Sequence, residues 1–174
     1  MKNYIYIILI FSSYQLLSQS DNKKTFNQII DGISISLTTP NNYQSVNDPN
    51  DDFKDYTIFL ISKNPTNNLI KLNQIPIPSN LENELKNDEK KHLEVFSSVI
   101  KNSSNVEIDL TSFKSLKING KKFYRLDFND GKFTHISFVT YYNRKMFILY
   151  FINKELEKEE MEELKTILNT FKLT

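Results

Sequence analysis

The chain has 174 residues, of which 22 are basic and 21 acidic, and it contains no cysteine. The lack of cysteine excludes disulfide bonds, thiolate metal sites and a cysteine nucleophile. The balanced charge argues against a nucleic-acid partner, because binding to phosphates needs a basic surface.

The first 20 residues have the pattern of a signal peptide. Lys2 precedes a continuous apolar run over residues 4–11, and the small residues Ser18 and Ser20 fit a signal-peptidase site, with cleavage after either one. The run is too short to cross a hydrocarbon core of about 30 Å. We therefore expect an exported protein, periplasmic or extracellular, with no stable membrane anchor after cleavage. Cleavage after Ser20 removes one basic residue and no acidic one, so the mature chain has no net charge.

Residues 21–174 have the usual length of one domain, and 13 Phe and 9 Tyr supply a large core without cross-links. Alternation with serine predicts a strand over residues 33–37. Pro40 lacks an N–H and ends this strand, which we expect to be short and at or near a sheet edge. Strands over 56–61 and 69–75 flank a Pro-Asn turn and form a hairpin.

Ser79 and Glu82 match the capping box and predict a helix that continues to about residue 102. A short strand over 106–110 follows. Two tight turns, one of them Asn119-Gly120, then predict an antiparallel meander with strands over 113–118, 121–128, 132–142 and 146–152. Asn153 can cap the last helix. Its acidic first half suits the helix dipole, its paired carboxylates are expected on the exposed side, and its apolar stripe runs to Phe171.

This order predicts an α+β fold with one antiparallel sheet of about six or seven strands and flanking helices. Aromatic residues of the meander point to both faces of the sheet. They are core if a second helix layer covers them, and otherwise they form an exposed patch or a pocket.

Candidate chemical residues are few. His92 and His135 show no metal-ligand spacing and are expected to be ordinary structural histidines. Asp48, Asn50 and Asp52 resemble the start of a calcium loop, but the phenylalanines at the sixth and twelfth positions break the EF-hand pattern. Neither a Gly-x-Ser-x-Gly motif nor a phosphate-binding loop occurs. We therefore predict no catalytic, cofactor-binding or metal-binding residues.

Four stretches resemble the PsbP-like family, which includes the extrinsic subunit of the plant oxygen-evolving complex and exported bacterial relatives. They are GISISLTTPNNYQ, INGKKFYRLDF, FVTYYNRKMFILYF and ILNTFKLT, and the resemblance covers about residues 31–174. It implies a PsbP-like α/β/α sandwich. It also implies a mostly non-enzymatic protein that acts by binding other proteins, as does the Ran-binding nuclear protein of the same fold. Nothing in the chain resembles the manganese- or calcium-related residues of the plant subunit.

The favoured function is an exported accessory or protein-binding module whose partner is another envelope or secreted protein. The alternative is a carrier or sensor of a small apolar ligand, which requires a closed pocket lined by aromatic residues. A third hypothesis is a hydrolase with an atypical site. It requires His92 or His135 beside an Asp, Glu or Ser in a cleft.

Overall fold

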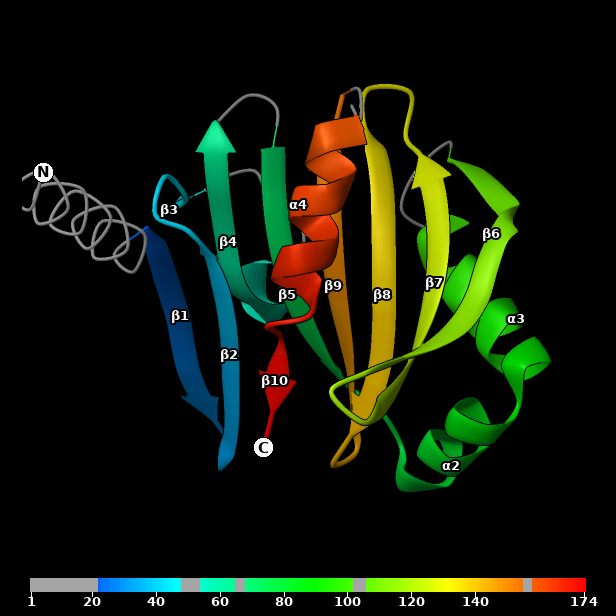
Figure 1. Cartoon of the computed structure of the whole chain (residues 1–174). Coiled ribbons are helices and arrows are strands. Elements are labelled where there is room, and N and C mark those ends of the chain that lie inside the picture. The colour runs from blue at the N-terminus through cyan, green and yellow to red at the C-terminus, as the bar shows by residue number, and fades with distance from the viewer. Residues whose placement is uncertain (1–21, 48–53, 65–67, 102–105, 155–157) are drawn as a thin grey trace, which may run out of the picture.

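The computed structural model describes residues 22–47, 54–64, 68–101, 106–154 and 158–174. These residues form a seven-stranded antiparallel sheet, a three-stranded antiparallel sheet and three α-helices (Figure 1). The predicted signal peptide, the calcium-like loop and the predicted end of the first helix near residue 102 lie outside the described residues. None of the described helices is long and apolar enough to cross a membrane.

The large sheet has the order β3-β4-β5-β9-β8-β7-β6. A short 3-10 helix, η1 (Lys54–Tyr56), leads into β4. The predicted β4–β5 hairpin and the four-stranded meander β6 to β9 are confirmed. The strands are β3 (Gln44–Ser45), β4 (Thr57–Asn64), β5 (Asn68–Pro76), β6 (Glu107–Ile118), β7 (Lys121–Asn129), β8 (Thr134–Tyr142) and β9 (Lys145–Asn153).

The small sheet joins the two ends of the described chain. Its order is β1 (Lys23–Ile30), β2 (Ile33–Pro40) and β10 (Lys172–Leu173). The expectation of a short edge strand at residues 33–37 is therefore wrong, because β2 has eight residues and lies between two partners. Pro40 is tolerated because it is the last residue of β2, opposite Lys23 at the open end of the hairpin.

The predicted first helix is two helices, α2 (Ser79–Asn87) and α3 (Glu89–Lys101), separated at Asp88, which is extended. The capping-box prediction is wrong. Pro78 occupies the N-cap position without a side-chain hydrogen bond. Glu82 instead accepts hydrogen bonds from Lys86 at 2.6 Å and from the backbone N–H of Arg144 at 2.7 Å. This tertiary contact satisfies a donor in the β8–β9 turn, where Arg144 has a φ of 58°.

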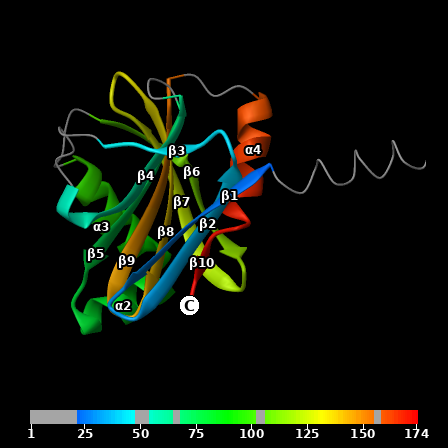
Figure 2. The ribbon, with the colours of Figure 1, turned by 90° about the vertical axis from the view of Figure 1, so that its left-hand side faces the viewer.

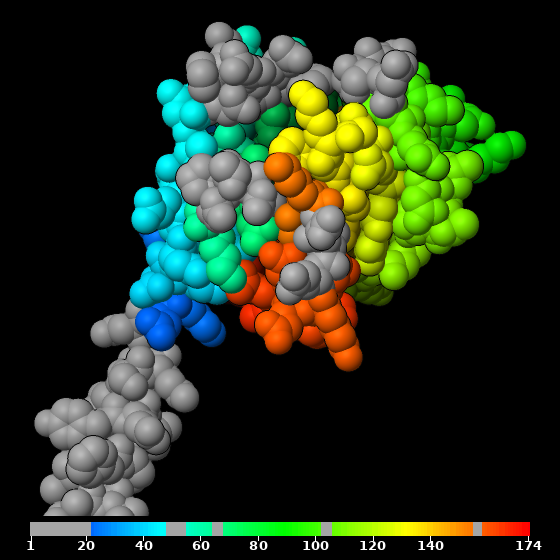
Figure 3. Space-filling view, turned by 90° about the horizontal axis from the view of Figure 1, so that it is seen from above, coloured from blue at the N-terminus to red at the C-terminus, as the bar shows by residue number. Residues whose placement is uncertain are grey.

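The last helix, α4 (Lys158–Leu168), ends earlier than predicted, and Phe171 lies in the connection to β10. Figure 2 shows the layers: α2 and α3 cover one face of the large sheet, and α4 with the small sheet covers the other. The view from above has α4 and the β1–β2 hairpin on one side of the sheet and α3 on the other (Figure 3). The molecule is therefore a sandwich with the large sheet in the middle.

Two apolar clusters lie on the two faces of the large sheet, one under each covering layer. Alternation along each strand directs neighbouring side chains to opposite clusters. On the α4 side lie Phe123, Phe138, Phe147 and Phe151. On the α3 side lie Phe96, Tyr124, Phe128 and Tyr141. Aromatic residues of the meander are thus mainly core, and burying each such ring contributes about 2 kcal/mol.

Candidate functional site

The amino-terminal half of α4 carries two glutamates that reach toward the strands, Glu160 and Glu163. Glu163 accepts a hydrogen bond at 2.8 Å from the hydroxyl of Tyr43, which lies just after β2. It also pairs at 3.1 Å with Lys63 of β4. One carboxylate therefore connects the helix to the chain leaving the small sheet and to the large sheet.

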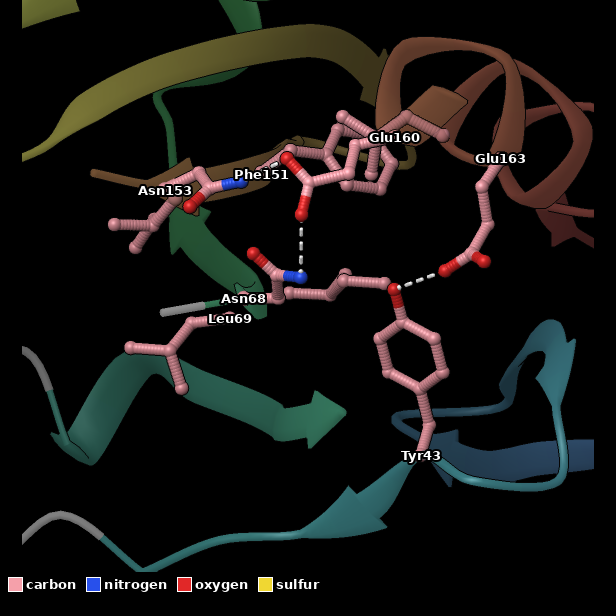
Figure 4. A pocket seen from close by; sticks show the side chains of 10 residues that line it. Tyr43, Asn68, Leu69, Phe151, Asn153, Glu160 and Glu163 are labelled. Atoms are coloured by element: carbon pink, nitrogen blue, oxygen red, sulfur yellow. Dashed lines mark hydrogen bonds between the residues drawn. The ribbon is translucent and has the colours of Figure 1, made fainter. Parts of the chain in front are cut away.

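Glu160 makes the second connection, to two central strands of the large sheet. Its carboxylate accepts hydrogen bonds from the side-chain amides of Asn68 in β5, at 2.9 Å, and Asn153 in β9, at 2.7 Å (Figure 4). We call these three residues, together with Tyr43, Lys63 and Glu163, the α4 latch. The latch joins α4 to the strands through three hydrogen bonds and one ion pair. These contacts stabilise the position of the helix.

The latch corrects two sequence-based expectations. Glu160 is half-buried and bound to strand residues, although the carboxylates of this helix were expected on its exposed side. Asn153 was expected to cap the helix, but its side chain binds Glu160. The signal that was missed is spacing: Glu160, Glu163 and Ile167 follow one another at the intervals of a single helix face.

Electrostatics in the latch keep the Tyr43 hydroxyl protonated near neutral pH. Burial, followed by the hydrogen bond to Glu163 and the negative charge of that group, raises the pKa of Tyr43 far above its usual value. The phenol therefore stays protonated and remains a donor. Near neutral pH, Tyr43 is therefore not present as the phenolate that could act as a base or nucleophile.

The hollows around α4 are small. The latch borders one of about 20 Å³ (Figure 4), and a second of about 40 Å³ lies between Phe138, Phe151 and Met161. A water molecule needs about 10–15 Å³ measured in this way, whereas ligand pockets span about 300–1,000 Å³. These two hollows have room for a few waters. Two larger ones, of about 220 and 510 Å³, are grooves open at the surface.

His92 is fully buried in the cluster between α3 and the large sheet. Its ring stacks on Tyr124 with centroids 4.1 Å apart, and its Nδ1 is hydrogen-bonded to the Tyr141 hydroxyl. Its Nε2 is buried without a hydrogen-bond partner among the described residues. Burial, with a smaller contribution from the charge of Lys122, lowers the pKa of His92 to about 4, so the ring is neutral at pH 7. A ring with no access to solvent cannot exchange protons with a substrate.

His135 lies on the same face of the sheet, near the β7–β8 turn. Its Nε2 is 2.9 Å from the Asp130 carboxylate, and its ring stacks on Phe128 with centroids 4.4 Å apart. Burial lowers the pKa of His135, and Asp130 opposes this shift. Burial raises the pKa of Asp130, but hydrogen bonds from His135 and the turn amides outweigh it, and the net shift is downward. The neutral imidazole of His135 and the carboxylate of Asp130 are thus hydrogen-bonded across the β7–β8 turn and stabilise it.

The two histidines do not form a joint site. His92 is held by Tyr141, which is six residues along β8 from His135, a separation of about 20 Å at about 3.3 Å per residue. The described residues contain no group of three or more His, Cys, Asp or Glu side chains that would hold a metal ion. Both histidines pack within aromatic clusters.

No protein-family model matches the chain, and no curated protein sequence matches it. Solved structures do match. Cyanobacterial PsbP (CyanoP) from Synechocystis superposes with a TM-score of 0.60 at 12% identity, over 88% of this chain and 93% of that chain. A Bacteroides thetaiotaomicron protein superposes with a TM-score of 0.55 at 14% identity, over 88% of this chain, which spans 49% of that one.

A third structure, LpqN, is a Mycobacterium tuberculosis protein involved in cell envelope biogenesis. It superposes with a TM-score of 0.49 at 14% identity, over 90% of this chain and 94% of that chain. The match to CyanoP confirms the PsbP-like fold and the α+β sandwich predicted from the sequence. At these identities the similarity establishes the fold alone.

Proposed function

We propose that the chain is an exported, non-enzymatic accessory protein that binds another envelope or secreted protein. The observation that carries this proposal is the close packing of the interior that the described residues form. The hollows bordered by α4 have room for a few water molecules, and the larger ones are grooves on the surface. Recognition on such a molecule takes place on its outside, which suits a macromolecular partner better than a small enclosed ligand.

The placement of the histidines supports the non-enzymatic part of the proposal. His92 is closed off from solvent, and His135 is bonded to Asp130 and stacked on Phe128. General acid–base catalysis needs a group that reaches the proton being transferred. Neither ring is offered to a substrate in this way.

Export is part of the proposal and is supported by the signal-like pattern of residues 1–20. Its direct test is mass spectrometry of the protein recovered from the culture medium and from the envelope fraction. We expect a polypeptide that begins at residue 19 or 21. A full-length chain that stays in the cytosolic fraction would contradict export.

The partner is tested by cross-linking in the native organism, followed by capture of the tagged chain and quantitative mass spectrometry. CyanoP is a matched control bait, because it has the same fold at 12% identity and subtracts contacts that any such sandwich makes. We expect at least one envelope or secreted protein to be enriched about ten-fold over the control. If no protein is enriched with this bait, the proposal is wrong.

One observation favours a second candidate function, a hydrolase. His135 lies beside a carboxylate, as that hypothesis requires. The test compares the wild-type chain with His135→Gln on ester, phosphate and peptide substrates. We expect no turnover by either protein, and turnover that is lost in the variant would establish the hydrolase instead.

A further inference from the structure

The last strand of the small sheet has an outer edge that no strand of the described chain occupies, although the Asn119 side chain bonds the Phe171 backbone oxygen beside it. β10 pairs with β2 and with no other strand of the described chain. The N–H and C=O of Thr174 both bond to Ser34 of β2, at 2.9 and 2.8 Å. Because hydrogen-bonding direction alternates along an antiparallel strand, the N–H and C=O of Leu173 point the opposite way, away from β2.

A groove of about 220 Å³ lies along this open edge, between β10 and the β6–β7 hairpin. We call it the β10 groove. Its floor is apolar, formed by Ile118, Phe123 and Phe171, each no more than 4% exposed. Figure 1 shows β10 between β2 and the end of this hairpin. This volume is more than five times that of either hollow beside α4, which measure about 20 and 40 Å³.

The groove is preformed. The Asn119 side chain in the hairpin turn donates hydrogen bonds to the backbone oxygens of Asn169, at 3.0 Å, and Phe171, at 2.7 Å. These bonds hold the hairpin at a fixed distance from the chain that enters β10. A rigid site avoids the free-energy cost of ordering on binding.

The rim of the groove is basic. Lys121 and Lys172 line it, and no lining residue has an acidic side chain. The Lys121 ammonium lies 4.1 Å from the centroid of the Tyr142 ring, which fixes its position beside the opening. An occupant with carboxylates is therefore favoured, whereas the basic segment at Lys23 and Lys24 of a second copy is disfavoured by charge.

We propose that the β10 groove binds an extended segment of the partner protein as an added strand, with apolar and acidic residues in alternation. This inference rests on the proposed function and specifies the partner. Side chains of an added strand alternate between its two faces. The side chains on the same face as the buried Leu173 contact the apolar floor of the groove. The side chains on the opposite face, the face of the exposed Lys172, contact the lysines. Main-chain bonds to Leu173 supply an affinity that does not depend on sequence.

The test uses ¹⁵N-labelled protein, purified after export, and the peptide acetyl-Val-Glu-Val-Glu-Val-amide. We expect millimolar peptide to shift the amide resonances of residues 118–123 and 171–173. Hydrogen exchange at the Leu173 amide should slow at least ten-fold, because binding occupies its free N–H. Shifts that fall on β1 or on residues 107–116 of β6 instead, or an unchanged exchange rate at Leu173, would overturn the proposal.

Charge reversal supplies the matched control. The double variant Lys121→Glu, Lys172→Glu should bind the Val-Glu peptide about five-fold more weakly and should bind the corresponding Val-Lys peptide better than the wild type does. Lys172→Glu alone, at an exposed position, repeats the test if the double variant unfolds. Equal binding of both peptides to the wild type, or binding of phosphatidylglycerol vesicles but not of the peptide, would refute the peptide assignment.

The same variant separates this inference from the proposed function. If the wild type and the charge-reversed variant capture the same partner equally well, the protein binds a partner elsewhere, and the groove assignment is wrong. If the peptide binds at the groove but cross-linking in the native organism captures no protein, the site is confirmed as peptide-binding and the proposed function is wrong.

Discussion

The buried His92 should make the free energy of unfolding depend on pH in a narrow range. Its pKa is about 4 in the folded protein, against an ordinary value of 6.5. Between pH 6.5 and 4 the unfolded chain therefore binds a proton at this ring that the folded chain does not. Since one pKa unit corresponds to about 1.4 kcal/mol, this histidine alone should remove up to about 3 kcal/mol of stability as the pH falls from 6.5 to 4. Above pH 6.5 its contribution is constant.

The assay is urea unfolding at half-unit steps from pH 7.5 to 4, followed by circular dichroism and tyrosine fluorescence. The informative variant is His92→Phe, which keeps an aromatic ring in the cluster but cannot titrate. It loses the hydrogen bond of Tyr141, so it should be less stable by about 1–3 kcal/mol at pH 7. The difference between the two proteins should shrink as the pH falls, because only the wild type acquires the cost of protonating His92.

Acidic groups whose pKa the fold lowers, such as Glu82, affect the stability of both proteins alike and cancel in the comparison. His135→Gln is the matched control, since His135 retains Asp130 as a partner that opposes its shift. We expect this variant to keep most of the slope. If wild type and His92→Phe lose stability in parallel from pH 6.5 to 4, then His92 titrates normally in the folded state, and the argument from burial is wrong.

Four further single variants and one double variant test the fold. Tyr43→Phe and Glu163→Gln should each lower the free energy of unfolding by about 1–2 kcal/mol. In a double-mutant cycle measured by denaturation, the double variant should lose less than the sum of the two single losses. Full additivity would mean that the hydrogen bond between Tyr43 and Glu163 contributes nothing. Glu82→Ala should cost about 2 kcal/mol and should speed hydrogen exchange at the Arg144 amide, whereas unchanged exchange would exclude the tertiary role of this carboxylate. Gly120→Ala should lower the free energy of unfolding, measured by thermal denaturation, by about 1 kcal/mol. The cause is backbone strain at a φ of 78°, because an added Cβ meets no atom within 4 Å. A variant as stable as the wild type would contradict this.

The meander was predictable because each of its signals is local. Asn119-Gly120 has the positive φ values that a tight hairpin turn needs, and the strands on both sides alternate or are continuously apolar. The large sheet therefore follows from short stretches of sequence. The resemblance to the PsbP-like family extended this local reading to the arrangement of the whole chain.

The small sheet was not predictable in the same way. β1 carries no alternating pattern, because nearly all of its side chains are exposed, and β10 has only two residues. Both are strands because β2 lies between them. Their structure is set by residues far away in sequence, which a local pattern cannot show.

The polar contacts were missed for a related reason. Ser79 and Glu82 satisfy the capping pattern, yet Glu82 is used by a turn 62 residues further along the chain. Glu160 and Glu163 resemble solubilising charges until the strands facing them are known. A carboxylate on a helix can bond locally or across the fold, and the choice depends on which unsatisfied donors the fold brings close.

The pairing of β2 with β10 also constrains the time course of folding. The backbone N–H of Thr38 bonds to the Thr170 hydroxyl, and these residues are 132 positions apart. During synthesis, the small sheet cannot be complete until residue 173 has left the ribosome, and contacts of such long range form slowly. An incompletely folded nascent chain is the form that a translocation pore accepts, which is consistent with the export proposed above.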